Sequence, residues 1–410
     1  MTGYFTRERF GRPQFLAGML LLAFFAQAAW LVLLESRVKT GLFGPEQVRV
    51  AEGWRQWHGL GIAGAPYLRP AGGVRGQISE DEGFDNEHSP LLSLISAAPL
   101  LPLPQRFWNT EAAASWQWLP RIPFLACGMF LGASLWYVAR RLCGHAGGFV
   151  ALTFYCFSPS MIQAAAVWHT EPEIVAAWGA FGAIFTAIAV AHTLYAPREV
   201  VLWNWRRIVL LGTSLAIAVG SQFSMIVVVP LALAFLLYVA PVRRQAAVVI
   251  WLAASLVGFV LLFAAYFFHP QAFAQAMRHA TFWGATWRGF AVLGVYKQIA
   301  AQIGRASPAL VFALPLTLAA YAAWPRTRYF GNTAPLLVAA LFFVLGMAHP
   351  HSAGEGFLLA AIPFLFIFVS GVLADLMETR HRPLVTACVV GMMLAYALWS
   401  LLNLARVPQG

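Results

Sequence analysis

The chain is a series of long apolar stretches separated by short polar loops, and this pattern restricts its fold more than any other feature. A helix that crosses a bilayer needs about 20 predominantly apolar residues. The stretches that approach or meet this length are 14–34, 119–139, 147–166, 174–195, 208–220, 223–240, 246–267, 307–324, 334–348, 356–376 and 384–404. The sequence therefore predicts an all-α polytopic membrane protein with about 11 transmembrane helices.

The composition supports a membrane protein. Hydrophobic residues make up 60% of the chain and charged residues 10%, whereas a soluble domain carries about 25% charged residues. The formal net charge is +11, and most of the basic residues are arginines in the loops between apolar stretches. That placement is typical of membrane topology, so we expect membrane lipids and no nucleic acid among the partners.

Arginine occurs in every second loop of the predicted topology. Cytoplasmic loops carry an excess of basic residues, so this alternation predicts a cytoplasmic N-terminus. The arginines concerned are Arg7, Arg9, Arg12, Arg140, Arg141, Arg198, Arg206, Arg207, Arg243, Arg244, Arg326, Arg328, Arg380 and Arg382. A single helix over 208–240 would put Arg207 and the Arg243–Arg244 pair on opposite sides of the membrane, against this alternation. Gly220, Ser221 and Gln222 in the middle of that stretch instead favour a tight hairpin or a re-entrant break.

Most of the acidic residues and many histidines lie on the opposite side of the predicted membrane. We therefore expect any chemistry on the extracytoplasmic face of a plasma-membrane protein. The whole chain, 1–410, reads as one transmembrane domain, with long outer loops at 35–118 and 268–306 and no soluble domain. In the first of these loops, PEQVRVAEGWRQWHGL and SPLLSLISAAPLLPLP predict two interfacial helices.

Four short motifs follow one another along this outer face. Glu46 stands at the start of the first interfacial helix, and residues 87–90 (Glu-His-Ser-Pro) precede the second. Residues 121–123 (Arg-Ile-Pro) open the next span, and Glu171 stands before a later one. In order and sidedness the motifs resemble the GT-C glycosyltransferases, particularly the protein O-mannosyltransferases and the aminoarabinose transferases of lipid A. The resemblance implies a GT-C-like helical bundle.

Two positions depart from the motifs of that family. The family's Asp-Glu pair reads Pro45-Glu46 here, and Ser89 replaces the first proline of a Pro-Pro motif. Asp81, Glu82 and Asp85 are nearby carboxylates that could replace the missing aspartate. In addition, Gln222 stands where relatives often have lysine.

The resemblance implies a reaction. Such enzymes transfer a sugar from a polyprenyl-phosphate carrier to a glycan, lipid or protein acceptor, with inversion at the sugar carbon. The reaction needs a general base for the acceptor hydroxyl and positive charge for the departing phosphate. The candidate bases are Glu46 and Asp85. Glu87 is the third catalytic candidate, and it would orient the substrate or bind a metal ion. The substrate-binding candidates are His88, Glu171, Gln222, Arg278, Arg288 and His349. A divalent metal ion is a candidate cofactor, with Glu87, His279 and His351 as candidate ligands.

Two other functions stay open at this point. A lipid-linked sugar transporter or flippase would place ionisable residues near the membrane midplane and commonly has two repeated halves. Here the predicted midplane is almost free of charge and no repeat is visible, which counts against transport. A non-catalytic GT-C relative is the other alternative, because Pro45 replaces the family aspartate.

Overall fold

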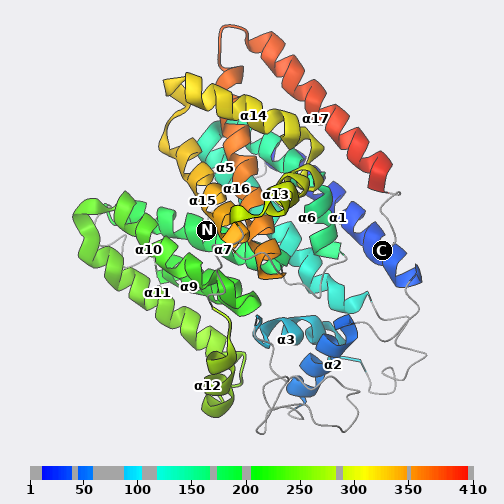
Figure 1. Cartoon of the computed structure of the whole chain (residues 1–410), viewed down its shortest axis with the longest axis vertical. Helices are drawn as coiled ribbons and strands as arrows, with labels where there is room; N and C mark the ends of the chain where they lie inside the picture. Colours follow the sequence, from blue (N-terminus) through cyan, green and yellow to red (C-terminus); the bar gives the residue numbers. More distant parts are fainter. Residues whose placement is uncertain are drawn as a thin grey trace, which may run out of the picture. The chain divides into compact units, whose positions relative to one another are not determined.

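The computed structural model describes residues 12–38, 45–58, 87–103, 118–166, 173–195, 205–282, 290–348 and 352–404. These residues form helices and turns, without a β-strand among them, as the sequence predicts. The chain divides into two compact units (Figure 1). Unit 1 comprises Met1–Glu35, Leu125–Val167 and Thr286–Gly410, and unit 2 comprises Ser36–Phe124 and Trp168–Ala285.

The described residues include seven helices that are long and apolar enough to cross a membrane. An eighth span results if α13 and α14, which are bent by 109° at Ser307, are counted as one. The stretches 119–139 and 147–166 lie on either side of Gly144, where the backbone is not helical, with φ 71° and ψ −174°. The helix after Gly144 ends at Cys156, and Leu119–Cys156 counts as one of the seven candidate spans. The chain is an integral membrane protein, but the count of eleven spans is not confirmed.

Unit 1 is a bundle around one central helix, α16. Every residue from Gly356 to Ala374 in α16 is buried. Phe342 packs edge-on against Phe364, with ring centroids 5.8 Å apart, and Phe154 stacks on Phe366 at 5.6 Å. The helices of unit 1 are α1 (Arg12–Val38), α5 (Ile122–Cys156, its first three residues in unit 2), α6 (Pro159–Ala166), α13 (Leu293–Ala306), α14 (Pro308–Ala323), η8 (Pro325–Thr327), α15 (Phe330–Ala348), α16 (Ser352–Met377) and α17 (Arg382–Leu404).

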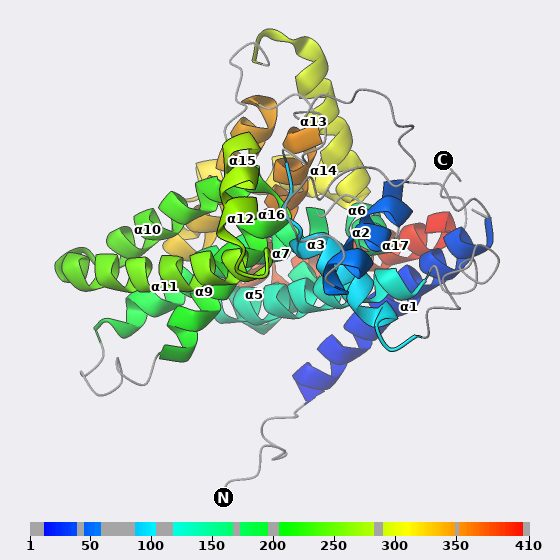
Figure 2. The same cartoon turned by 90° about the horizontal axis from the view of Figure 1, so that it is seen from below.

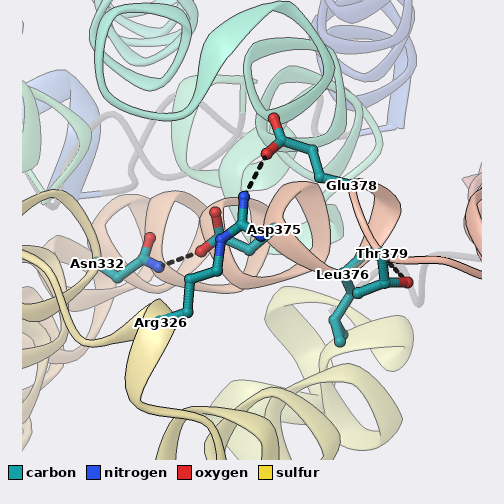
Figure 3. A network of polar contacts seen from close by, with 6 residues as sticks. All are labelled: Arg326, Asn332, Asp375, Leu376, Glu378 and Thr379. Atoms are coloured by element: carbon teal, nitrogen blue, oxygen red, sulfur yellow. Dashed lines mark hydrogen bonds and ion pairs between the residues drawn. The ribbon is translucent and has the colours of Figure 1, made fainter.

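Two turns of unit 1 that carry arginine meet at one end of α16. Arg326 of η8 pairs with Glu378 just after α16, at 3.3 Å, and Asn332 of α15 donates to Asp375 of α16 at 2.9 Å (Figure 3). The bend after Arg140 and Arg141 lies beside the same end, because a Cβ added at Gly147 would lie 3.5 Å from Ala374. These loops therefore share one end of unit 1, as the alternation of arginine-rich loops predicts.

Helix α5 ends inside unit 1 at a junction of polar side chains. The carbonyls of Phe154, Cys156 and Phe157 face no following helical turn. They accept hydrogen bonds from Tyr396 (3.3 Å), Gln27 (3.1 Å) and Ser400 (2.8 Å), respectively. In a membrane-embedded bundle such donors replace the water that would otherwise satisfy these carbonyls. At the next residue, Ser158 Oγ donates to the carbonyl of Ala306 at 2.5 Å.

Unit 2 contains three long helices, α7 (Glu173–Thr193), α9 (Trp205–Ser221) and α11 (Arg244–Ala264), that pack through small residues. Helix α9 contacts both α7 and α11, and α9 and α11 lie side by side in both views (Figure 1, Figure 2). A Cβ at Gly179 of α7 would overlap the backbone of Ala218 of α9, and a Cβ at Gly258 of α11 would lie 3.0 Å from the carbonyl oxygen of Gly212. Close approach at small residues is a common way for helices to pack in a bilayer.

The helices of unit 2 follow the predicted order. They are α2 (Pro45–Trp57), α3 (Leu91–Ala97), η2 (Ala98–Leu100), η4 (Leu119–Arg121), α7 (Glu173–Thr193), α9 (Trp205–Ser221), η5 (Phe223–Val227), α10 (Val228–Val239), η6 (Pro241–Arg243), α11 (Arg244–Ala264) and α12 (Pro270–His279). Both helices predicted in the first outer loop are present, as α2 and α3. The predicted break between 208–220 and 223–240 is also present, because α9 ends at Ser221 and Gln222 is extended, with φ −153° and ψ 117°.

Candidate functional site

The candidate site in unit 2 is centred on the junction between residues 87–89 and the end of α9. Ser89 N–H donates to the carbonyl of Gly220 at 3.2 Å, and Ser89 Oγ donates to the same oxygen at 2.5 Å. Phe223 N–H donates in return to the carbonyl of Glu87 at 2.8 Å. We call this set of contacts the 87–223 junction. It fixes the backbone on both sides of His88.

The local sequence explains why the junction forms. The extended backbone of Gln222 ends α9, which leaves the carbonyl of Gly220 without an acceptor role in the helix. Gly220 also permits the close approach, because a Cβ there would lie 2.9 Å from Leu91 Cδ2 and 3.3 Å from Ser89 Oγ. A proline disfavours helical backbone at the residue before it, so Pro90 favours an extended Ser89 that can enter the junction.

Helix α12 covers the junction from a second direction. The Phe223 side chain is fully buried in a cluster that includes Met277, Ala280 and Phe282. The rings of Phe223 and Phe282 are 5.4 Å apart. Because Arg278 and His279 lie between these packed residues, the last turn of α12 carries both beside the 87–223 junction. The structure thus places the backbone of Glu87 and the last turn of α12 against the same residue, Phe223.

The side chains at this place differ in burial. Glu87, His88 and His279 are half-buried, whereas Arg278 is exposed. His279 Nδ1 donates to the carbonyl of Gln275 at 2.9 Å, which fixes the orientation of its ring. Gln222 is only 5% exposed and belongs to the bend of α9 rather than to an open surface.

Buried polar side chains occur on three elements of unit 2 that pack together, α2, α3 and η4. Trp57 Nε1 donates to the carbonyl of Leu94 at 2.9 Å, and a Cβ at Gly53 would overlap the carbonyl of Ser93, so α2 lies directly on α3. The buried polar side chains on these elements are Glu52, Gln56, Ser93, Ser96 and Arg121. Burying a carboxylate or a guanidinium costs free energy unless the charge is paired. Glu52 and Arg121 are both buried and both have interaction partners.

The burial of Glu52 was not predicted from the sequence, and Arg121 was predicted only as part of a motif. A signal was available in the first interfacial helix, where Gly53 interrupts an otherwise amphipathic pattern. Gly53 and Gln56 occur at helical spacing, which marks a face of α2 that approaches another backbone. Glu173, 5% exposed in the first turn of α7, is a further buried carboxylate that was not predicted.

Several predicted residues cannot be placed. Glu46 lies in the first turn of α2, where the side chain is not described. The predicted site residues outside the described residues are Asp85, Glu171, Arg288, His349 and His351. Within the described part of the chain, no group of three or more His, Cys, Asp or Glu could hold a metal ion. The metal site therefore stays a prediction.

Comparison with known proteins places this geometry on a known fold. No protein-family model and no curated protein sequence matches the chain. The crystal structure of ArnT from Cupriavidus metallidurans in the apo state is similar, with a TM-score of 0.57 and 15% sequence identity, over 94% of this chain and 75% of ArnT. The archaeal oligosaccharyltransferase AglB from Archaeoglobus fulgidus, in complex with an inhibitory peptide and a dolichol-phosphate, gives a TM-score of 0.48 and 11% identity, over 95% of this chain and 55% of AglB. The likeness to ArnT confirms the GT-C fold expected from the sequence.

Proposed function

We propose that this integral membrane protein is a glycosyltransferase that moves a sugar from a polyprenyl-phosphate carrier to an acceptor on the extracytoplasmic face. The observation that carries the proposal is the 87–223 junction. On a fold shared with ArnT, it holds Glu87 and His88 beside the basic last turn of α12. The acceptor class, whether glycan, lipid or protein, is left open.

The helix directions of unit 2 support the proposed side of the membrane. Helix α9 has Arg206 and Arg207 in its first turn and ends at the junction. Helix α11 begins at Arg244, directly after Arg243, and its other end leads into α12. Both helices therefore carry arginine at the end remote from the junction. Because basic residues favour the cytoplasmic side, this supports an extracytoplasmic site.

The proposed chemistry divides between two charges. A carboxylate takes the proton from the acceptor hydroxyl as that oxygen attacks the anomeric carbon, and the bond to the carrier phosphate breaks. Glu87 is the candidate base whose backbone the junction fixes, and Glu46 and Asp85 remain the other candidates. Arg278 and His279, in the last turn of α12, are the candidates for the positive charge that stabilises the departing phosphate. No step is assigned to a metal ion.

The test is release of polyprenyl phosphate from polyprenyl-phosphate sugars by the purified protein in nanodiscs, with and without a divalent metal ion. We expect turnover by the wild type and its loss in Glu87→Gln and Glu171→Ala. Glu378→Gln is the matched control, because Glu378 is an exposed carboxylate at the arginine-rich end of unit 1. Turnover that survives both site variants would exclude this site. The absence of turnover with every donor would favour the transporter or the non-catalytic relative.

A further inference from the structure

The hydroxyl of Ser89 makes two hydrogen bonds, one as a donor and one as an acceptor. Its hydrogen goes to the carbonyl of Gly220 at 2.5 Å, and its oxygen accepts from Leu91 N–H at 3.3 Å. Ser89 is only 4% exposed. One buried hydroxyl therefore joins the start of α3 to the end of α9, two elements that are far apart in the sequence.

The carbonyl of Gly220 receives both donors of Ser89, its N–H and its hydroxyl. A carbonyl oxygen has two lone pairs, so these two bonds satisfy it fully. The neighbouring Phe223 N–H, which also lies at the break of α9, is satisfied by the carbonyl of Glu87. The two segments thus exchange hydrogen bonds in both directions, as a short bridge between extended strands would.

The consequence falls on residues 87 and 88. The backbone of Glu87 is held through its carbonyl, and that of Ser89 through its N–H and hydroxyl. Pro90 then restricts the backbone on the other side through its ring. His88 lies between two fixed residues and Glu87 ends the fixed segment, so the directions of both side chains depend on the junction.

We propose that Ser89 is a positioning residue that sets the orientation of Glu87 and His88 through the Gly220 carbonyl. The kinetic consequence of this proposal rests on the proposed function, whereas the effect of Ser89 on the backbone of Glu87 and His88 is independent of it. Ser89 acts through its neighbours and is not assigned contact with substrate.

The structural test is amide hydrogen exchange of the full-length protein in nanodiscs. In Ser89→Ala we expect the Leu91 and Phe223 amides to exchange about three to ten times faster than in the wild type, because the hydroxyl ties both segments to one carbonyl. Ser89→Thr keeps the hydroxyl and should restore wild-type exchange. Ser96→Ala is the matched control, since Ser96 is equally buried on α3 but donates only to Ser93 within that helix.

The kinetic test uses the same variants with a polyprenyl-phosphate sugar. Loss of orientation at a reacting group lowers kcat more than it changes KM, and we expect kcat of Ser89→Ala to fall about 10- to 100-fold with KM within about twofold. Ser89→Thr should recover most of kcat.

The outcomes separate the two proposals. Faster exchange at both Leu91 and Phe223, in Ser89→Ala but not in Ser96→Ala, supports the structural role of Ser89 even if no sugar donor is turned over. In that case only the proposed function fails. Unchanged exchange at Phe223 would overturn the structural role of Ser89. Faster exchange with unchanged kcat would overturn its role in positioning Glu87 and His88.

Discussion

The two units each contain a buried Ser-Pro junction, and the comparison between them separates a structural device from a candidate site. In unit 2, Ser89 Oγ donates to Gly220 at the end of α9, and in unit 1, Ser158 Oγ donates to Ala306 at the end of α13, both at 2.5 Å. Each hydroxyl also accepts from a backbone N–H two or three residues further on. The chain thus uses one device twice to satisfy a carbonyl at the end of a distant helix.

The surroundings of the two junctions differ. The side chains that donate to the carbonyls around Ser158 are Gln27, Tyr396 and Ser400, and none of them is charged at neutral pH. Beside Ser89 stand two ionisable residues, Glu87 and His88, both half-buried. We infer that the unit 1 junction serves packing, whereas the unit 2 junction also orients the two candidate site residues, Glu87 and His88.

The largest expected effect tests the charged side of this comparison. Glu87→Gln keeps the shape of the side chain and removes its basicity. If Glu87 is the general base, kcat should fall about 100- to 10,000-fold. The measurement is the rate of polyprenyl-phosphate release by protein in nanodiscs, and the thermal unfolding midpoint should stay close to that of the wild type. Full activity would move the base to Glu46 or Asp85.

A substitution at the other serine should have the opposite profile. Ser158→Ala leaves the buried carbonyl of Ala306 without this donor, which costs about 1–3 kcal/mol of stability. We expect a lower thermal unfolding midpoint in detergent, with turnover per folded molecule within about twofold of the wild type. A Ser158→Ala variant of normal stability and low kcat would contradict the assignment of this junction to packing.

The side-chain donors around Ser158 should contribute less individually. Gln27→Leu removes the donor to the carbonyl of Cys156, which is 3.1 Å away, and we expect a loss of about 1 kcal/mol. Denaturant titration of the purified protein would measure it, with Ser158→Ala and the double variant alongside. Because Cys156, whose carbonyl Gln27 binds, is only two residues from Ser158, the two losses should not be additive. Strict additivity would show that the bonds act independently.

The smallest effect is expected at the exposed ion pair in Figure 3. The Arg326 and Glu378 side chains are 62% and 69% exposed, so their 3.3 Å contact should contribute less than about 0.5 kcal/mol. Arg326→Ala should leave both the unfolding midpoint and the turnover unchanged within error. A clear loss of either would mean that this end of unit 1 does more than mark a side of the membrane.

The sequence predicts those features of the fold that rest on local pattern. The all-helical class, the helices at 45–57 and 91–97, and the break at Gln222 follow from hydropathy, proline and glycine, and the structure contains all of them. The number of spans is less well predicted. Apolar length alone does not distinguish a full span from α9, which is 17 residues long, or from the bent pair of α13 and α14.

The site is predicted only in part, for a physical reason. Charge and order in the sequence single out Glu87 and His88, and the resemblance to a family adds weight to them. The bond from Ser89 to Gly220 joins residues 131 positions apart, and no local pattern reports such a contact. The burial of Glu52 and Arg121 is likewise a property of tertiary packing. From sequence alone, a carboxylate on an amphipathic helix is expected to be solvated. The packing of α3 against α2, which the local pattern does not report, is what buries Glu52.

The complete burial of α16 has a consequence for how the protein is made. Hydropathy lets this helix enter the bilayer, yet in unit 1 it contacts protein along the whole of Gly356–Ala374 and retains no lipid-facing surface there. Helices α5, α14 and α15, against which it packs, precede it in the chain and leave the ribosome earlier, whereas α17, which also packs against it, follows. Most of the helices that surround α16 are therefore synthesised before α16 itself. Helix α16 can then exchange lipid contacts for protein contacts as soon as it is released into the membrane.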